Sequence, residues 1–365
     1  MRGACENARF LMKRRSVLKI GGALPLLSLG SLGAVDAFGQ AKPASVTVLT
    51  WGGLWGDALQ KGVGQRLTAQ TGVPVIEDRG STPDQRITKL KVGLAHQTYD
   101  LVQLHDGLFP LAVSQGVLQK INPHSPRLTN LPDVYPQFKH EYWVAQIYSA
   151  IGIAYNAKAI KKPPRSWADL WRPEFRGKIV LPASSHSIGL YIIPIGAMAA
   201  GKSPKDGDAG FEMFEKMVKL QPIFEPDTDT IMADLVSGEA TIGVLYNAQT
   251  ETVAKRNRDV KWVFPEEGAI SISWGTGIAK NAPSLDYAER FLNLTLDPQG
   301  QIGFAEAFNY PGTNRKTQAL LPPALQKSIV LSDAERSRLV DLDQQYMSEQ
   351  RVSWMSRWNR IVAGA

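Results

Sequence analysis

Residues 150–183 read AIGIAYNAKAIKKPPRSWADLWRPEFRGKIVLPA, and this stretch decides the fold of the chain. Ile151–Tyr155 is apolar and bounded by turn formers, which predicts a buried strand. Ser166 is a suitable N-cap for a short helix that carries Trp167 and Leu170 and is closed by the following proline. Lys178–Leu181 then predicts another strand. Two strands around a short aromatic helix indicate the start of a second α/β lobe in the middle of the chain.

The first part of the chain alternates between predicted strands and helices. Strands are expected at 45–50, 73–76 and 99–104, and helices at 57–71, ending at Gly72, and after Ser81. This alternation predicts a doubly wound sheet, in which ligands bind at the carboxyl ends of the strands. The later part continues the pattern, with helices expected at 188–201, 208–220, 230–237 and within 332–361, and a strand at 241–246.

Candidate ligand contacts follow three of these strands. Trp51, Gly52, Gly53 and Trp55 come directly after the first one. Glycines there let backbone N–H groups approach a ligand, and tryptophans stack on flat or apolar groups, although either tryptophan could instead belong to the core. His105 and Asp106 end the strand at 99–104, where they form either part of the cleft or only a hydrogen-bonded turn. An aromatic residue and an amide, Tyr246 and Asn247, end the strand at 241–246.

Several motifs resemble one family in order and spacing over most of the chain. The run 167–178, PEEG (265–268), FLN with LDP (291–298) and YPGTN (310–314) resemble solute-binding proteins of ABC importers, in particular the spermidine/putrescine-binding-like subfamily of extracellular solute-binding protein family 1. The resemblance implies an α/β fold of the two-lobed type II periplasmic-binding-protein kind, with each lobe a doubly wound sheet flanked by helices. Lobe 1 is expected to comprise 42–150 and 275–316, and lobe 2 151–274 and 317–365.

The resemblance also implies a function. Such a protein closes about its hinge on a small-molecule solute and delivers it to an inner-membrane ABC permease and its ATPase. It acts as a monomer without a cofactor, a metal ion or a nucleic-acid partner. Position by position, the resemblance adds five site residues to those above. Ser184, Ser185 and Ser187 lie in the loop after the strand at 178–181, and Trp274 and Thr276 lie in the second crossing at 270–280. The three serines could equally form a helix cap.

The predicted pocket differs from that of a polyamine binder. The carboxylates that pair with ammonium groups in this subfamily fall on Gly53, Ala183–Ser184, Ser187 and Trp274, and its stacking tryptophan falls on Tyr246. A desolvated dication needs paired carboxylates. We therefore expect a neutral, zwitterionic or carboxylate solute, with a genuine spermidine/putrescine binder as the alternative.

Enzymes and ferric-ion binders form a second alternative. The sequence contains no G-x-S-x-G, H-E-x-x-H or P-loop motif, and Tyr246 has no adjacent tyrosine of the kind that holds ferric ions. The five histidines show no metal-ligand spacing, and Cys5 is the only cysteine. Without residues 1–41 the net charge falls from +7 to +3, because 35 basic and 32 acidic residues remain, which argues against nucleic-acid binding.

The N-terminal residues 1–41 predict a cleaved signal peptide and hence a periplasmic protein. KRRSVLK (13–19) precedes an apolar run, Ile20–Ala34, and matches a twin-arginine (Tat) export signal. The alternative is a membrane anchor, but the run is shorter than the ~20 residues that span a bilayer. Met12 stands directly before the basic motif and is an alternative translation start.

Overall fold

The computed structural model describes residues 42–364. The predicted signal peptide, with the alternative start at Met12, lies outside the described residues. Within residues 42–364, no helix combines the length and the hydropathy that crossing a membrane requires.

The described strands join into one mixed sheet. Its order is β2-β1-β3-β9-β4-β7-β5-β6, and β8 pairs with β4. Pairing is parallel among β1, β2 and β3 and among β5, β6 and β7, whereas β9 and β4 run antiparallel to their neighbours. The strands are β1 (Val46–Leu49), β2 (Val75–Asp78), β3 (Leu101–His105), β4 (Trp143–Asn156), β5 (Ile179–Pro182), β6 (Ile223–Glu225), β7 (Ile242–Tyr246), β8 (Val260–Val263) and β9 (Ile270–Ile278).

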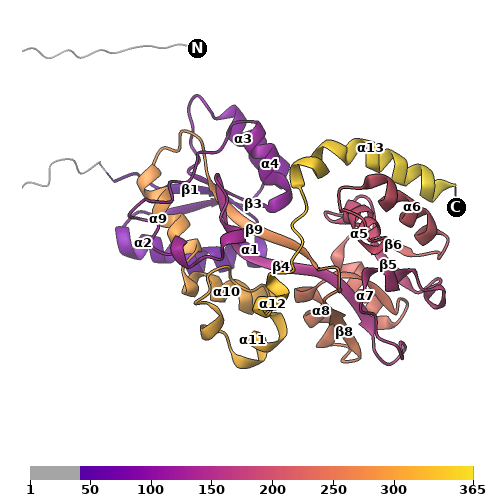
Figure 1. Cartoon of the computed structure of the whole chain (residues 1–365). Helices are drawn as coiled ribbons and strands as arrows, with labels where there is room; N and C mark the ends of the chain where they lie inside the picture. Colours follow the sequence, from indigo (N-terminus) through magenta and orange to yellow (C-terminus); the bar gives the residue numbers. More distant parts are fainter. Residues whose placement is uncertain (1–41, 365) are drawn as a thin grey trace, which may run out of the picture. The chain divides into compact units, whose positions relative to one another are not determined.

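Helices cover this sheet in two groups (Figure 1). α1 to α4 and α9 lie around β1 and β3, and α5 to α8 lie around β5 and β7. The helices are α1 (Gly53–Leu59), α2 (Gln65–Thr71), α3 (Pro83–Val92), α4 (Phe109–Ser114), α5 (Ile192–Ala199), α6 (Gly207–Val218), α7 (Thr228–Ser237), α8 (Asn247–Ala254), α9 (Leu285–Thr295), α10 (Pro298–Phe308), α11 (Pro323–Ile329), α12 (Asp333–Arg336) and α13 (Gln344–Ala363).

The buried apolar side chains form two large cores, one in each group. β4 crosses between them, because Ala150 belongs to the first core and Ile151 to the second. β9 returns, with Ile272 in the second core and Ile278 in the first. Two crossing strands therefore connect two cores, which confirms the two-lobed α/β prediction and adds that β4 and β9 make the sheet continuous.

The chain crosses between the cores a third time. Leu331 packs in the first core and Leu342 in the second. α13 follows this crossing and contacts α4 on one side and α6 on the other. Figure 1 shows it as the yellow helix that runs from α4 to α6.

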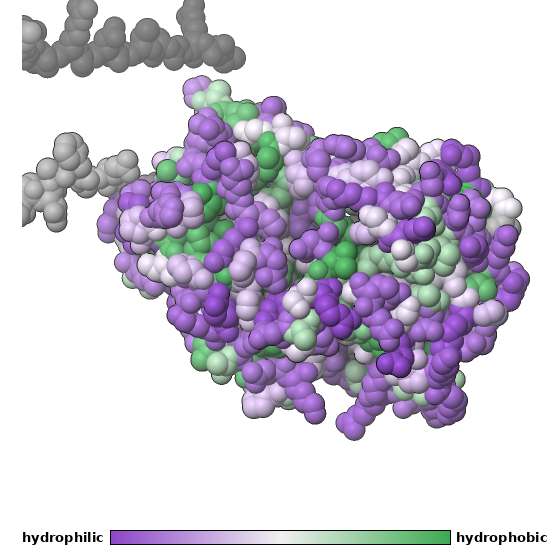
Figure 2. Space-filling model, in the orientation of Figure 1, coloured by the Kyte–Doolittle hydropathy of each residue, from purple (hydrophilic) through white to green (hydrophobic). Residues whose placement is uncertain are grey.

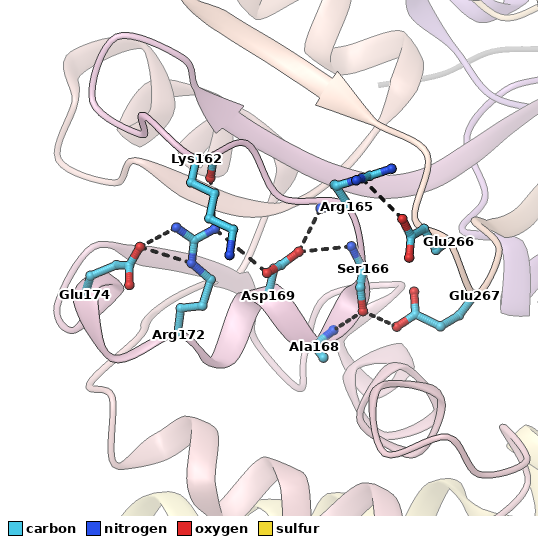
Figure 3. A network of polar contacts seen from close by, with 9 residues as sticks. All are labelled: Lys162, Arg165, Ser166, Ala168, Asp169, Arg172, Glu174, Glu266 and Glu267. Atoms are coloured by element: carbon cyan, nitrogen blue, oxygen red, sulfur yellow. Dashed lines mark hydrogen bonds and ion pairs between the residues drawn. The ribbon is translucent and has the colours of Figure 1, made fainter.

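The central aromatic motif folds as predicted, and Figure 3 shows the polar contacts around its N-cap, Ser166. Residues Trp167–Trp171 form a short 3-10 helix, η5, and Ser166 Oγ accepts a hydrogen bond from Ala168 N at 3.1 Å. Glu267, from the predicted PEEG motif, accepts hydrogen bonds from Ser166 Oγ at 2.5 Å and from Trp167 N at 3.0 Å. Two motifs about a hundred residues apart in the sequence thus hold each other in place.

The first helix departs from its predicted bounds. α1 begins at Gly53 rather than near Asp57, and a π-helical segment, Gln60–Gly64, separates it from α2. Gly53 has a φ of 56°, a left-handed conformation that glycine adopts without strain. In the π-helical segment, a Cβ on Gly62 would lie 3.1 Å from the Gly300 carbonyl oxygen, so this glycine allows α10 to approach closely. The C-cap at Gly72 is confirmed, with a φ of 73°.

Candidate functional site

A cavity of about 350 Å³ lies between the two groups of elements. We call it the cleft cavity. The first group contributes His105, the second contributes Ser185, Ser187 and Tyr191, and α13 contributes Gln344 and Arg351. Tyr191 Oη donates a hydrogen bond to Gln344 Oε1 at 3.2 Å. The face of the molecule in Figure 2 is mainly hydrophilic, with apolar surface in its middle, between the two groups.

Aromatic rings from both groups meet where β9 crosses. The Trp274 ring lies 4.6 Å from Tyr310, 6.4 Å from Tyr246 and 6.3 Å from Trp55, measured between ring centroids. Trp51 packs edge-on against Trp55 at 4.7 Å. The structure therefore brings together four of the predicted site residues, the two tryptophans after β1, Tyr246 after β7 and Trp274, as one aromatic cluster.

A buried arginine lies against this cluster. The Arg86 guanidinium carbon is 4.1 Å from the centroid of the Trp51 ring, and the residue is 1% exposed. Its Nε donates to the Ser81 carbonyl at 3.2 Å and its Nη1 to the Gln103 carbonyl at 2.8 Å. Among the described residues no carboxylate lies within 4.0 Å of it. Burial lowers the pKa of Arg86 to about 10, so it remains charged at neutral pH.

A buried hydrogen-bond network around Gln103 holds the side chains of Trp55 and Thr276 in place. Gln103 Oε1 accepts from Trp55 Nε1 at 2.8 Å, and Gln103 Nε2 donates to Thr276 Oγ1 at 3.2 Å and to Gln146 Oε1 at 2.9 Å. Thr276 is fully buried and Trp55 is 9% exposed. The network thus holds Trp55 in the aromatic cluster and keeps Thr276 in the core behind the cluster.

His105 and Asp106 are adjacent in sequence but line different cavities. His105 lines the cleft cavity, whereas Asp106 lines a second cavity with Ser271 and Ser273 of β9. Burial lowers the pKa of His105 to about 4, so the imidazole is neutral at neutral pH. The carboxylate of Asp106 accepts a hydrogen bond from Ser273 N at 2.7 Å, and burial raises its pKa to about 7.

The remaining predicted residues occupy helix starts and one loop. Gly52 is the N-cap of α1, and Gly53 is its first residue. Asn247 is the buried first residue of α8, directly after Tyr246. Ser184 lies in the same loop as Ser185 and Ser187 but does not line the cleft cavity. A role of any of these residues in ligand binding stays a prediction.

Sequence reasoning missed Arg86, Tyr191 and Tyr310. Arg86 lies on the buried face of α3, beside Ile87 and Leu90, and a charged residue there is the signal that could have identified it. Tyr310 is the first residue of the YPGTN motif, and the pattern of that motif does not mark it as a site residue. No local pattern marks Tyr191, because its position beside Gln344 depends on α13, which is distant in the sequence.

Known proteins resemble this chain along most of its length. Residues 96–348 match the family described as bacterial extracellular solute-binding protein. The spermidine/putrescine-binding periplasmic protein of Escherichia coli is 25% identical over 77% of this chain and 82% of its own length. The gamma-aminobutyric acid-binding protein of Pseudomonas aeruginosa is 24% identical over 87% of this chain and 91% of its own length.

A solved structure agrees with these relatives. The crystal structure of an ABC transporter from Clostridium perfringens superposes with a TM-score of 0.78 at 25% identity, covering 87% of this chain and 100% of that chain. The family match spans more than two thirds of the chain, and its members' two-lobed architecture is the one described above. This chain therefore belongs to the bacterial extracellular solute-binding proteins.

Proposed function

We propose that this protein is the solute-binding component of an ABC importer. It captures a small organic solute between its two lobes and delivers it to an inner-membrane permease and its ATPase. The observation that carries the proposal is the cluster of rings from both groups of elements, placed where β9 crosses between two separate cores. Such an interlobe position suits a ligand that both lobes grip on closure.

We propose hinge closure as the mechanism. We place the lobe boundaries in β4 at 150/151, in β9 at 274/275 and at 316/317. In support, the core to which the buried residues belong changes between Ala150 and Ile151, between Ile272 and Ile278, and between Leu331 and Leu342. Connections confined to three crossings let each core move as a unit. Relatives named as periplasmic support a periplasmic location, with residues 1–41 as a Tat-type signal. We also propose that the protein acts as a monomer.

The solute class that we propose is a zwitterion or a carboxylate. Arg86 supports it, because a buried guanidinium without a carboxylate partner favours an anionic group nearby. One relative is named for gamma-aminobutyric acid, a zwitterion, and another for spermidine and putrescine, which are cations. A polyamine remains the alternative.

Thermal unfolding of the purified protein with a panel of solutes tests both statements. The panel contains 4-aminobutyrate, 5-aminopentanoate, glutarate, putrescine and spermidine. A solute present at about 100 times its dissociation constant stabilises the folded state by about 2.7 kcal/mol. We expect a higher melting temperature with amino acids or carboxylates, and a shift with polyamines alone would establish the alternative.

The variant Arg86→Met sharpens the test. Methionine keeps most of the packing volume and removes the charge, so we expect the affinity for a carboxylate-bearing solute to fall at least about tenfold. Arg258→Met is the matched control, because Arg258 is exposed and lines neither cavity. Equal losses in both variants, or unchanged affinity in Arg86→Met, would contradict the assignment of Arg86.

A further inference from the structure

A second and larger cavity lies beside the crossing strands. Its volume is about 450 Å³, and we call it the hinge cavity. Its walls come from α4, the segment 137–143, β9 and the segment 341–345. None of the loops that follow β5, β6 and β7 contributes to it, so it is separate from the cleft cavity. The proposed transport function assigns it no role.

One wall of the hinge cavity is aromatic. The rings of Phe109 and Trp143 stack with their centroids 4.0 Å apart and an interplanar angle of 4°. The His140 ring stacks on the other face of Trp143, with the two ring centroids 3.9 Å apart and an interplanar angle of 12°. Burial lowers the pKa of His140 to about 4, so the imidazole contributes no positive charge at neutral pH. Because its two neighbours cover both faces of Trp143, the stack gives the cavity a rigid, mainly apolar border rather than an open ring face.

Another part of the lining is acidic. Asp106 lies there with 13% of its side chain exposed, and Asp341 lies exposed on the segment after the third crossing. Asp106 accepts hydrogen bonds from the backbone N–H groups of Ser273 at 2.7 Å and Gly107 at 2.8 Å, and from Ser273 Oγ at 3.4 Å. These neutral donors leave its negative charge without a counterion.

The lining contains no lysine or arginine among the described residues. The nearest imidazole, His105, has its Nδ1 4.0 Å from Asp106 Oδ1 and is neutral at neutral pH. A carboxylate buried without a cation is costly, and a bound ammonium group would offset that cost.

We propose that the hinge cavity binds a small organic monoamine, whose ammonium group lies against Asp106 and Asp341 and whose apolar body packs on the Phe109–Trp143 wall. The volume is sufficient for a single-ring amine. Segments on both sides of the crossings form the walls, so the occupant contacts parts of the chain that hinge motion would move.

Calorimetric titration of the full-length protein with 2-phenylethylamine tests the proposal. The neutral analogue 2-phenylethanol and the anion 3-phenylpropionate serve as matched ligands. We expect the amine to bind at least tenfold more tightly than either analogue. Asp341→Asn and Asp106→Asn are each expected to weaken amine binding at least tenfold, with folding of each variant checked by its melting temperature.

A pair of serine-to-tryptophan variants distinguishes the two cavities. Ser114 lines the hinge cavity and Ser185 lines the cleft cavity, and both serines are exposed. Ser114→Trp is expected to abolish amine binding, and Ser185→Trp to leave it unchanged. The proposal is overturned if the amine does not bind, if the alcohol binds equally well, or if Ser185→Trp is the variant that loses binding. None of these results depends on the identity of the transported solute.

Discussion

Gln103 shows how a single buried polar residue positions a site that it does not line. It is fully buried on β3, and its amide group links Trp55, Thr50, Gln146 and Thr276. Thr50 directly follows β1, and the other partners lie on α1, β4 and β9, so one side chain ties the crossing strands to the turn that carries Trp51. Its position amid apolar neighbours on a predicted strand marks it in the sequence, but its partners are distant and no local pattern reveals them.

Replacing Gln103 with leucine is expected to destabilise the protein by about 2–4 kcal/mol. The substitution leaves the Trp55 indole N–H and the Thr50 hydroxyl without their acceptor, whereas Gln146 and Thr276 keep the bond to each other. Each unsatisfied buried group costs about 1–3 kcal/mol. Denaturant unfolding measures the change. Gln326→Leu, at an exposed position on α11, is the control and is expected to stay within about 0.5 kcal/mol of the wild type. Similar values for the two variants would contradict the role of the network.

Asp106 predicts a pH dependence of stability. Its folded-state pKa is about 7, above the usual 3.8, so between these pH values the folded state holds the proton more tightly than the unfolded state does. Its contribution to the free energy of unfolding therefore falls as the pH rises from about 4 to about 7, and then stays constant. At about 1.36 kcal/mol per pKa unit, the change amounts to at most about 4 kcal/mol.

Asp106→Asn removes this titration. We expect the stability of the variant relative to the wild type to increase with pH across that window, as measured by urea unfolding at several pH values. Parallel pH profiles for the two proteins would show that the carboxyl group is not protonated in the folded state.

At the scale of elements, the short helix after Ser166 depends on a contact that spans a hundred residues. Ser166 caps η5, and Glu267 binds both the Ser166 hydroxyl and the Trp167 N–H. Trp167, fully buried, donates from its indole to the Gly268 carbonyl at 2.9 Å. The cap, the buried ring and the PEEG turn thus form one unit.

Ser166→Ala is expected to destabilise the protein by about 1–2 kcal/mol, because the variant loses the N-cap and leaves Glu267 without its hydroxyl partner. Ser337→Ala is a matched control, since Ser337 is exposed and its hydroxyl donates only to the Ala334 carbonyl within its own turn. Thermal unfolding of both variants measures the difference. A loss for Ser337→Ala as large as that for Ser166→Ala would contradict this account.

The sequence predicts elements better than it predicts their ends or their joints. The strand around Ile151 and the cap at Ser166 follow from local patterns, and the structure confirms both. The start of α1 at Gly53 does not follow from a local pattern, because the helix begins inside the Gly-Gly turn on a residue with a left-handed conformation. The placement of Arg86 under Trp51, and of His105 and Asp106 in different cavities, depends on how distant segments pack, which residue types and spacing alone do not encode.

At the scale of the whole described chain, three crossings connect two cores. β4 and β9 pair along their length, and the third crossing joins β9 through the bond from Ser271 N to the Val340 carbonyl at 3.0 Å. α13 then contacts elements of both groups. Motion of one core relative to the other would change the cleft cavity and the hinge cavity, because residues 341–351 contribute to both.

Small-angle X-ray scattering tests the proposed hinge closure. Once the thermal panel has identified a stabilising solute, we expect the radius of gyration to decrease when this solute is added, because both lobes contact it and the closed form makes more of these contacts. Ser185→Trp fills the cleft cavity and is expected to show no decrease under the same conditions. A solute that stabilises the wild type but leaves its radius of gyration unchanged would show that binding proceeds without closure. The three crossings would then act as a rigid frame rather than as a hinge.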